Sequence, residues 1–161
     1  MERFVGIDIG GTNIRIIQAS SLELPTLEKR EVFSTTGNFD EDFKKVTGYL
    51  DSIETPIKGV GIAIPGDLAE DKSMVAYAVH IPGYMNKPLP QLLSQKYACK
   101  VLMDNDAATA ALGEAIYGTS DKSDFLYIIW GTGVGGAEVS YREGKPSAKD
   151  VDWDRYLRSF D

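Results

Sequence analysis

The sequence predicts an α/β fold built on a mixed β-sheet, and three observations support it. The chain has 161 residues, of which 43% are hydrophobic and 25% charged, as in ordinary globular proteins. Its first two apolar segments have strand-like patterns and meet at Gly10-Gly11, which predicts a hairpin. Farther along, short apolar runs alternate with segments of helical periodicity, as expected for helices that pack on a sheet.

Most of the predicted elements end near a glycine, a proline or a capping residue. Residues 4–9 are nearly all apolar, as in a strand buried on both faces, whereas residues 13–18 alternate polar and apolar. The predicted strands span residues 4–9, 13–18, 28–35, 59–64, 100–103, 124–130 and 137–141, and the predicted helices span residues 40–53, 88–97 and 106–117. We expect a long loop after Pro65-Gly66, a glycine-rich turn over 131–136, and a polar stretch with a terminal helix over 145–161.

Charge and rare residue types exclude several classes of protein. The net charge is −7 and no run of five or more Lys or Arg occurs, so nucleic acid is not an expected partner. Cys99, the single cysteine, cannot form an internal disulfide, and together with the single histidine, His80, it leaves too few ligands for a zinc site within the chain. We find no basic leader and no stretch of about eighteen apolar residues, and therefore expect no membrane partner and a cytoplasmic location.

The segment Asp8–Asn13 is a candidate phosphate-binding turn. Its two glycines let backbone N–H groups approach a phosphate, Thr12 adds a hydroxyl, and Asp8 can hold the magnesium ion that accompanies a nucleotide. An ordinary hairpin that needs positive φ at its glycines is the alternative. The segment is not the dinucleotide fingerprint, which needs a third glycine and a helix, and it is not a P-loop, which needs Gly-Lys-Ser/Thr.

The segment Asp104–Ala107 lies where a predicted strand ends and a predicted helix begins. Asp106 can be a plain N-cap there. It can equally be a catalytic carboxylate, because open α/β sheets present such groups at the carboxyl ends of their strands. One positioned carboxylate suffices as general base for a hydroxyl that attacks phosphorus.

Three other turns carry weaker signals. The turn Gly131–Gly136 holds four glycines in six positions and is a plausible second phosphate cradle through its N–H groups and Thr132, or else a loop tip without function. Pro65-Gly66-Asp67 and His80–Tyr84 are ordinary turns when taken alone, and His80 alone is more often structural. Trp130 and Trp153 are expected to serve packing.

Taken together, five segments in this order resemble the ROK family of sugar kinases and sugar-responsive regulators. The resemblance runs from Val5 to about Val139. It is carried by Asp8-Ile9-Gly10-Gly11-Thr12-Asn13, Gly59-Val60-Gly61-Ile62-Ala63-Ile64-Pro65-Gly66, Ile81-Pro82-Gly83-Tyr84 with Pro88-Leu89, Asn105-Asp106-Ala107 with Ala110-Ala111-Leu112-Gly113-Glu114, and Gly131-Thr132-Gly133-Val134-Gly135-Gly136. It implies a ribonuclease H-like (actin-like ATPase) domain over residues 1–118 and the opening hairpin of a second, nucleotide-side lobe over 119–161.

The resemblance also implies an activity and a role for each motif. The activity is transfer of the γ-phosphoryl group of ATP to a hexose hydroxyl, with Mg²⁺. Asp106 would be the general base and Asn105 would hold sugar hydroxyls. Pro65, Gly66, His80 and Gly83 would line the sugar pocket. The first phosphate-binding segment would consist of Asp8, Gly10, Gly11 and Thr12, with Asp8 also binding the metal. The second would consist of Gly131, Thr132 and Gly133.

The sequence departs from the family pattern at three points. His80 stands where the family usually has Asn before the Pro-Gly turn, and Ala108 stands where it usually has Asn. The family's second half, with its Gly-Glu-hydrophobic-Gly-His loop and Cys-rich zinc motif, does not follow Gly136. The chain is therefore expected to be inactive alone, with a missing C-terminal half or a second copy as its partner.

Three other functions stay open at this point. A non-catalytic sugar-sensing or interaction module of the same fold is the main alternative to the kinase. A sugar-dependent DNA-binding repressor would need a helix-turn-helix before the first strand. A nuclease of the same fold class would need several clustered acids, for which Asp8, Asp104 and Asp106 are candidates.

Overall fold

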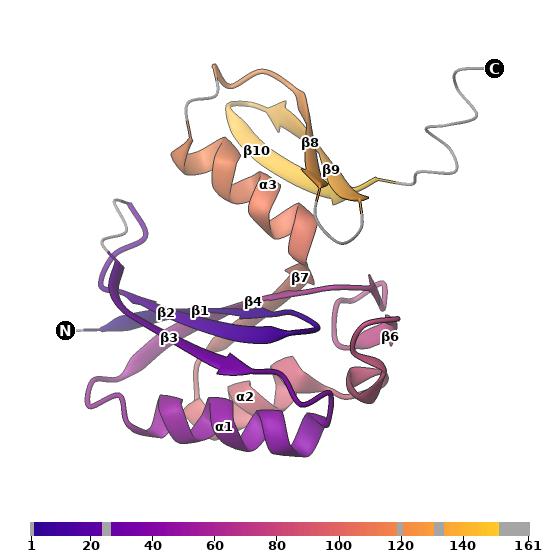
Figure 1. The fold of residues 1–161 in the computed structure, drawn as a ribbon. Helices are drawn as coiled ribbons and strands as arrows, with labels where there is room; N and C mark the ends of the chain where they lie inside the picture. Colours follow the sequence, from indigo (N-terminus) through magenta and orange to yellow (C-terminus); the bar gives the residue numbers. More distant parts are fainter. Residues whose placement is uncertain (1, 24–26, 119–120, 131–133, 152–161) are drawn as a thin grey trace. The chain divides into compact units, whose positions relative to one another are not determined.

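A computed structural model of the chain describes residues 2–23, 27–118, 121–130 and 134–151 (Figure 1). The chain divides into two compact units, Met1–Asp104 and Asn105–Asp161. The helix over 106–117 thus groups with the second unit, whereas the resemblance puts it in the first lobe. The lobe boundary after residue 118 stays a prediction.

A five-stranded mixed sheet forms the centre of the first unit. Its strands run in the order β3-β2-β1-β4-β7. Strand β1 pairs antiparallel with β2 and parallel with β4, which confirms both the glycine hairpin and the mixed sheet. The strands are β1 (Arg3–Ile9), β2 (Asn13–Ala19), β3 (Leu27–Ser34), β4 (Ile57–Ile64) and β7 (Lys100–Asn105).

Two helices cover one face of this sheet, as Figure 1 shows. Helix α1 (Phe39–Asp51) is capped by Asn38, whose side chain accepts the N–H groups of Asp40 and Glu41. Helix α2 (Leu89–Tyr97) follows Pro88, which occupies the N-cap position, so the helix starts one residue later than the predicted range of 88–97. The apolar stripes of both helices join the inward residues of β1, β2 and β4 in one core. Its fully buried aliphatic side chains include Ile14, Ile16, Leu50, Ile64 and Leu93.

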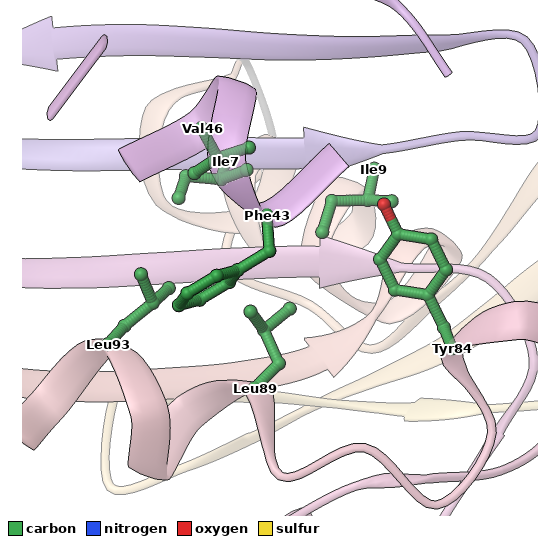
Figure 2. A pocket seen from close by; sticks show the side chains of 7 residues that line it. All are labelled: Ile7, Ile9, Phe43, Val46, Tyr84, Leu89 and Leu93. Carbon is green, nitrogen blue, oxygen red and sulfur yellow. The ribbon is translucent and has the colours of Figure 1, made fainter. Parts of the chain in front are cut away.

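This core leaves a void too small for a ligand (Figure 2). The void measures about 10 Å³, which is at most the space of one water molecule, and its wall is almost wholly apolar. Its lining comes from β1, both helices and the 3-10 helix described next: Ile7, Ile9, Phe43, Val46, Tyr84, Leu89 and Leu93. It is a packing gap, and the candidate site must lie elsewhere.

The segment between β4 and α2 is more structured than the expected long loop. It contains the short hairpin strands β5 (Asp67–Leu68) and β6 (Val75–Tyr77) and a 3-10 helix over Pro82–Tyr84. The prediction of a plain loop is wrong there. Strands of two and three residues are too short for their periodicity to be read from sequence.

The second unit is a helix packed on a three-stranded antiparallel sheet of order β10-β9-β8. Ala108 and Ala111 of the helix share a buried apolar cluster with Ala137 and Val139 of the sheet, and Phe125 and Tyr127 pack against this cluster. The other side of the strand that carries Phe125 and Tyr127 is largely exposed, with Ile128 54% and Trp130 88% exposed, so the residues that the structure describes do not give Trp130 the packing role predicted for it. The elements are α3 (Asp106–Tyr117), β8 (Phe125–Trp130), β9 (Val134–Arg142) and β10 (Lys145–Asp150).

Two boundaries in this unit differ from expectation. The turn predicted over 131–136 is shorter, because Gly135 and Gly136 pair as strand residues with Ile129 and Ile128. A Cβ at Gly135 would lie 3.9 Å from the Ala107 Cβ, which is an ordinary contact distance, so β9 packs near α3 there without requiring a glycine. Residues 145–150 form β10 rather than part of a terminal helix, and the rest of that prediction lies outside the described residues.

In the described part of the chain, no helix is long and apolar enough to cross a membrane. Nor do those residues contain a group of three or more His, Cys, Asp or Glu side chains placed to hold a metal ion.

Candidate functional site

The parallel pairing of β1 with β4 gathers the first unit's candidate residues at one edge of the sheet. Asp8 stands beside Ala63 in the register, so the segments that follow both strands leave from the same edge. These segments are the turn Gly10–Asn13 and Pro65-Gly66. Carboxyl ends of parallel strands are where open α/β sheets bind ligands.

The turn Gly10–Asn13 is tight and firmly anchored. The Gly10 N–H donates to the Asn13 carbonyl at 2.8 Å. Thr35 donates its N–H to the Thr12 carbonyl at 2.9 Å and its hydroxyl to the Gly10 carbonyl at 2.7 Å. Neither glycine has a positive φ, so the positive φ expected for an ordinary hairpin here is wrong, although the hairpin itself is present.

Gly11 is a contact point between two candidate segments. A Cβ at Gly11 would lie 3.1 Å from the His80 Cβ, closer than most real side-chain contacts. The absence of a side chain at this position therefore lets the candidate phosphate turn meet the candidate sugar segment. Gly11 and Thr12 themselves are exposed, as a turn that meets a ligand must be.

Asp8 forms an ion pair with Arg15 on the neighbouring strand, at 2.8 Å between Oδ2 and Nη1. Both side chains are 44% exposed, so the pair contributes little to stability. Mg²⁺ is commonly held by one or two carboxylates together with water and substrate phosphates. A single half-exposed carboxylate beside a glycine turn fits that donor set.

A cleft of about 240 Å³ opens beside this turn. Its lining combines three residues predicted for the sugar pocket with four that were not predicted for it. The predicted ones are Pro65, Gly66 and His80, and the others are Asp67, Tyr77, Ala78 and Val79. The polar side chains Asp67, Tyr77 and His80 give the cleft hydrogen-bonding groups, and Tyr77 and Val79 are largely exposed.

Gly66 gives this cleft its shape. Its φ is +109°, and a Cβ there would lie 2.4 Å from the Tyr77 carbonyl oxygen and 2.9 Å from the Ala78 Cβ. Only glycine allows the backbone after β4 to pass this close to β6.

We expect Gly66→Ala to lower the free energy of unfolding by more than the 1–3 kcal/mol that an unfavourable φ costs, since the backbone clash adds to it. Gly48→Ala is the matched control. Gly48 lies exposed within α1 with nothing near its Cβ position, so that change should stabilise by about 0.5–1 kcal/mol. Urea unfolding of both variants measures the two effects, and equal shifts would contradict the role given to Gly66.

Gly83 packs on the loop before α1. A Cβ at Gly83 would lie 2.2 Å from the Gly37 carbonyl oxygen, and its 3-10 helix is fixed by the buried Tyr84. Gly83 is absent from the lining of the cleft, so its place in a sugar pocket stays a prediction.

In the second unit, the start of α3 separates the roles of two adjacent residues. Asn105 is the N-cap, because its Oδ1 accepts the N–H groups of Ala107 at 2.8 Å and Ala108 at 3.2 Å. Asp106 is the first helical residue, and its carboxylate accepts the Ala107 N–H at 2.9 Å. The N-cap interpretation of Asp106 is thus wrong. One turn later, the buried Thr109 hydroxyl has no hydrogen-bond partner among the described residues.

Several predictions about the site remain untested. Asp8 and Asp106 each follow a short apolar strand, from which we predict that they face each other across one cleft. Asp8 lies in the first unit and Asp106 in the second, so this stays a prediction. The second phosphate segment, Gly131, Thr132 and Gly133, lies outside the described residues. Asp104, a candidate in the nuclease interpretation, forms an ion pair with Lys72.

Comparison with known proteins identifies the family. The model of the ROK family matches residues 4–144. The chain belongs to the ROK family. The expected ribonuclease H-like (actin-like ATPase) α/β fold is confirmed by ROK kinases of known structure.

The relatives include both enzymes and a regulator. A glucokinase from Halalkalibacterium halodurans is 34% identical over 146 residues, which are 85% of this chain and 44% of that protein. A xylose repressor from Caldicellulosiruptor bescii is 32% identical over 145 residues, covering 81% of this chain and 35% of the repressor. The crystal structure of the inorganic polyphosphate/ATP-glucomannokinase of an Arthrobacter species superposes with a TM-score of 0.71 at 28% identity, over 91% of this chain and 60% of that one. The chain spans about half the length of the curated relatives it matches.

Proposed function

We propose that this chain supplies the sugar-binding side and the general base of an ATP-dependent sugar kinase, with a hexose as acceptor. One observation carries the proposal: the glycine turn of β1–β2 touches His80, which lines the cleft that Pro65 and Gly66 also line. A glycine turn with exposed backbone groups, next to a cleft that carries hydrogen-bonding side chains, is the arrangement that phosphoryl transfer to a small hydroxyl compound needs. The glucokinase and glucomannokinase relatives supply the substrate class.

The chemistry assigns one task to each group. The cleft residues Asp67, Tyr77 and His80 offer hydrogen bonds to sugar hydroxyls. The turn Gly10–Asn13 presents backbone groups and the Thr12 hydroxyl toward phosphate oxygens. Asp8 is the carboxylate placed to hold Mg²⁺, which neutralises charge on the phosphates when bound.

Asp106 takes the proton of the attacking sugar hydroxyl in this proposal. Its neighbour Asn105 already caps α3, so the backbone does not need the Asp106 carboxylate for capping. The Oδ1 of Asn105 is engaged in that cap, so contact with a sugar hydroxyl would fall to its amide nitrogen. A positioned carboxylate contributes about 10²–10⁴-fold as a general base.

A sugar-responsive regulator is the second candidate. The 32% identity to the xylose repressor favours it, because that similarity covers 81% of this chain, nearly as much as the 85% covered by the similarity to the glucokinase. Such a protein would keep the cleft and bind sugar without transferring phosphate. The cytoplasm as the site of action stays a prediction under both functions.

The single histidine offers a direct test of sugar binding at the cleft. Because His80 is the only histidine, its imidazole signals in a proton NMR spectrum need no assignment. We expect glucose, mannose or xylose to shift these signals in a saturable way, whereas glycerol at equal concentration should not. If added sugar shifted other proton signals in a saturable way but left the His80 signals unchanged, the proposed sugar site would be contradicted.

A further inference from the structure

Asp42 is a completely buried carboxylate in the first turn of α1, with 0% of its surface exposed. Burial of a charged group is costly unless hydrogen bonds and a counter-charge compensate for it. The helix itself does not require this group, because Asn38 caps α1 and Asp40 and Glu41 already place negative charge at its N-terminus. Asp42 must therefore stabilise something other than α1.

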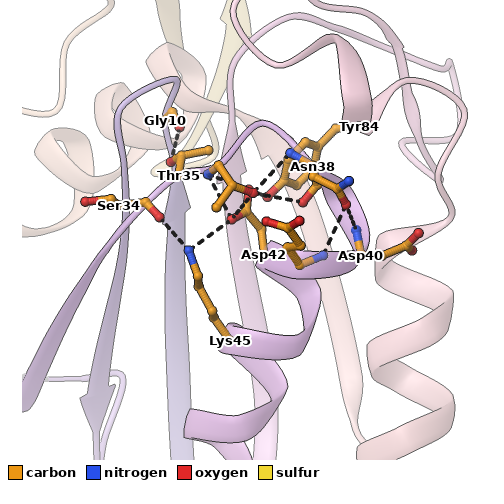
Figure 3. A network of polar contacts seen from close by, with 10 residues as sticks. Gly10, Ser34, Thr35, Asn38, Asp40, Asp42, Lys45 and Tyr84 are labelled. Atoms are coloured by element: carbon orange, nitrogen blue, oxygen red, sulfur yellow. Dashed lines mark hydrogen bonds and ion pairs between the residues drawn. The ribbon is translucent and has the colours of Figure 1, made fainter.

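Its contacts join two loops to the helix (Figure 3). Thr36 donates its N–H at 3.0 Å and its hydroxyl at 3.0 Å to Oδ1 of Asp42. Tyr84, at the end of the 3-10 helix, donates its phenol hydroxyl to Oδ2 at 3.0 Å. Lys45 supplies the counter-charge at 3.7 Å and donates to the Ser34 carbonyl. Burial and the nearby Asp42 charge raise the pKa of Tyr84, so the phenol remains a donor at neutral pH.

The Thr35-Thr36 pair links this carboxylate to the candidate phosphate turn. While Thr36 binds Asp42, Thr35 holds the Thr12 carbonyl through its N–H and the Gly10 carbonyl through its hydroxyl. On the other side, Gly83 rests directly on the Gly37 carbonyl of the same loop. A continuous series of short contacts thus runs from the β1–β2 turn to the segment Val79–Tyr84, which borders the cleft.

We propose that Asp42 is a positioning residue that holds the segment Val79–Tyr84 in register with the turn Gly10–Asn13. The inference rests on the proposed function, in which the first segment contacts the sugar and the second contacts phosphate. Transfer between two bound groups depends steeply on their relative position, so a buried clamp between the segments serves the reaction. Asp42 acts through Tyr84 and Thr36 and touches neither substrate.

Tyr84→Phe tests this with little disturbance, because it removes one hydroxyl and keeps the ring against Phe39. Tyr97→Phe is the matched control. Tyr97 also donates its hydroxyl to a carboxylate of α1, Asp51, but at the far end of that helix. Amide hydrogen exchange of the whole chain, followed by NMR, reports the Thr35 N–H, which binds Thr12, and the Tyr84 N–H, which binds Ile81.

We expect exchange at these two amides to be about tenfold faster in Tyr84→Phe, as loss of a hydrogen bond to a charged group implies, and unchanged in Tyr97→Phe. Glucose affinity, measured by calorimetry, should fall about tenfold in Tyr84→Phe alone. Asp42→Asn should give the same pattern more strongly, because the amide has only one acceptor oxygen for donors that bind both oxygens of the Asp42 carboxylate, and it carries no charge.

Equal changes in the two tyrosine variants, or unchanged exchange at Thr35 in Tyr84→Phe, would overturn the positioning role. A wild-type chain that binds no sugar would count against the proposed function instead. The exchange comparison, which needs no ligand, would still decide the role of Asp42.

Discussion

In a protein of full ROK length that contains this chain, Asp106→Asn is expected to lower kcat for sugar phosphorylation about 10²–10⁴-fold. The amide has the size of the carboxylate but cannot take the proton of the attacking hydroxyl. Sugar affinity, measured by calorimetry, should be nearly unchanged. Stability should also change little, because Asn105 and not Asp106 caps α3.

Asp104→Asn is the control for this experiment. It makes the same substitution two residues earlier, at a carboxylate that forms an exposed ion pair with Lys72. Loss of an exposed pair costs about 0–1 kcal/mol, so both kcat and stability should be close to wild type. Unchanged turnover in Asp106→Asn would remove the general base from the proposed mechanism.

The second large effect concerns the 161-residue chain by itself, which is expected to show no turnover above background with ATP, Mg²⁺ and a sugar panel. Kinases of this kind close two lobes around the nucleotide, and the closure excludes water and aligns the phosphates. The chain spans about half the length of its curated relatives, so much of that enclosure would be missing.

A coupled steady-state assay of the purified chain measures this directly. Turnover on the order of 1–100 s⁻¹, as kinases show, would contradict the expected dependence on a second half. Sugar binding detected at His80 in the same preparation provides the control, since it separates a folded but inactive chain from an unfolded one.

The sequence predicted most of the fold because its long elements have clear periodicity. The helix over 106–117 agrees with the structure at both ends, and the hairpin at Gly10-Gly11 has the expected antiparallel pairing. Prediction from the sequence failed where strands are very short and where glycines lie within a strand instead of in a turn. The strands β5 and β6 are too short to show a pattern, and Gly135-Gly136 reads as a turn although it lies within β9.

For the candidate site, the sequence predicted the glycines and the motif residues but not the groups that hold them in place. The turn at Gly66 could be predicted, because a Pro-Gly pair after a strand indicates a turn. The positioning role of Asp42 could not be predicted, because it depends on a contact with Tyr84, which is 42 residues away in the chain. The same holds for Asp67 and Tyr77, which enter the cleft only through the pairing of β5 with β6.

Phosphorylation of glucose by a protein of full ROK length that contains this chain tests the central proposal most directly. With ATP and Mg²⁺ we expect a sugar phosphate to form at a rate on the order of 1–100 s⁻¹, and this rate to fall sharply in Asp106→Asn. Saturable sugar binding at His80 without any phosphoryl transfer would contradict the kinase and would favour the sugar-responsive regulator.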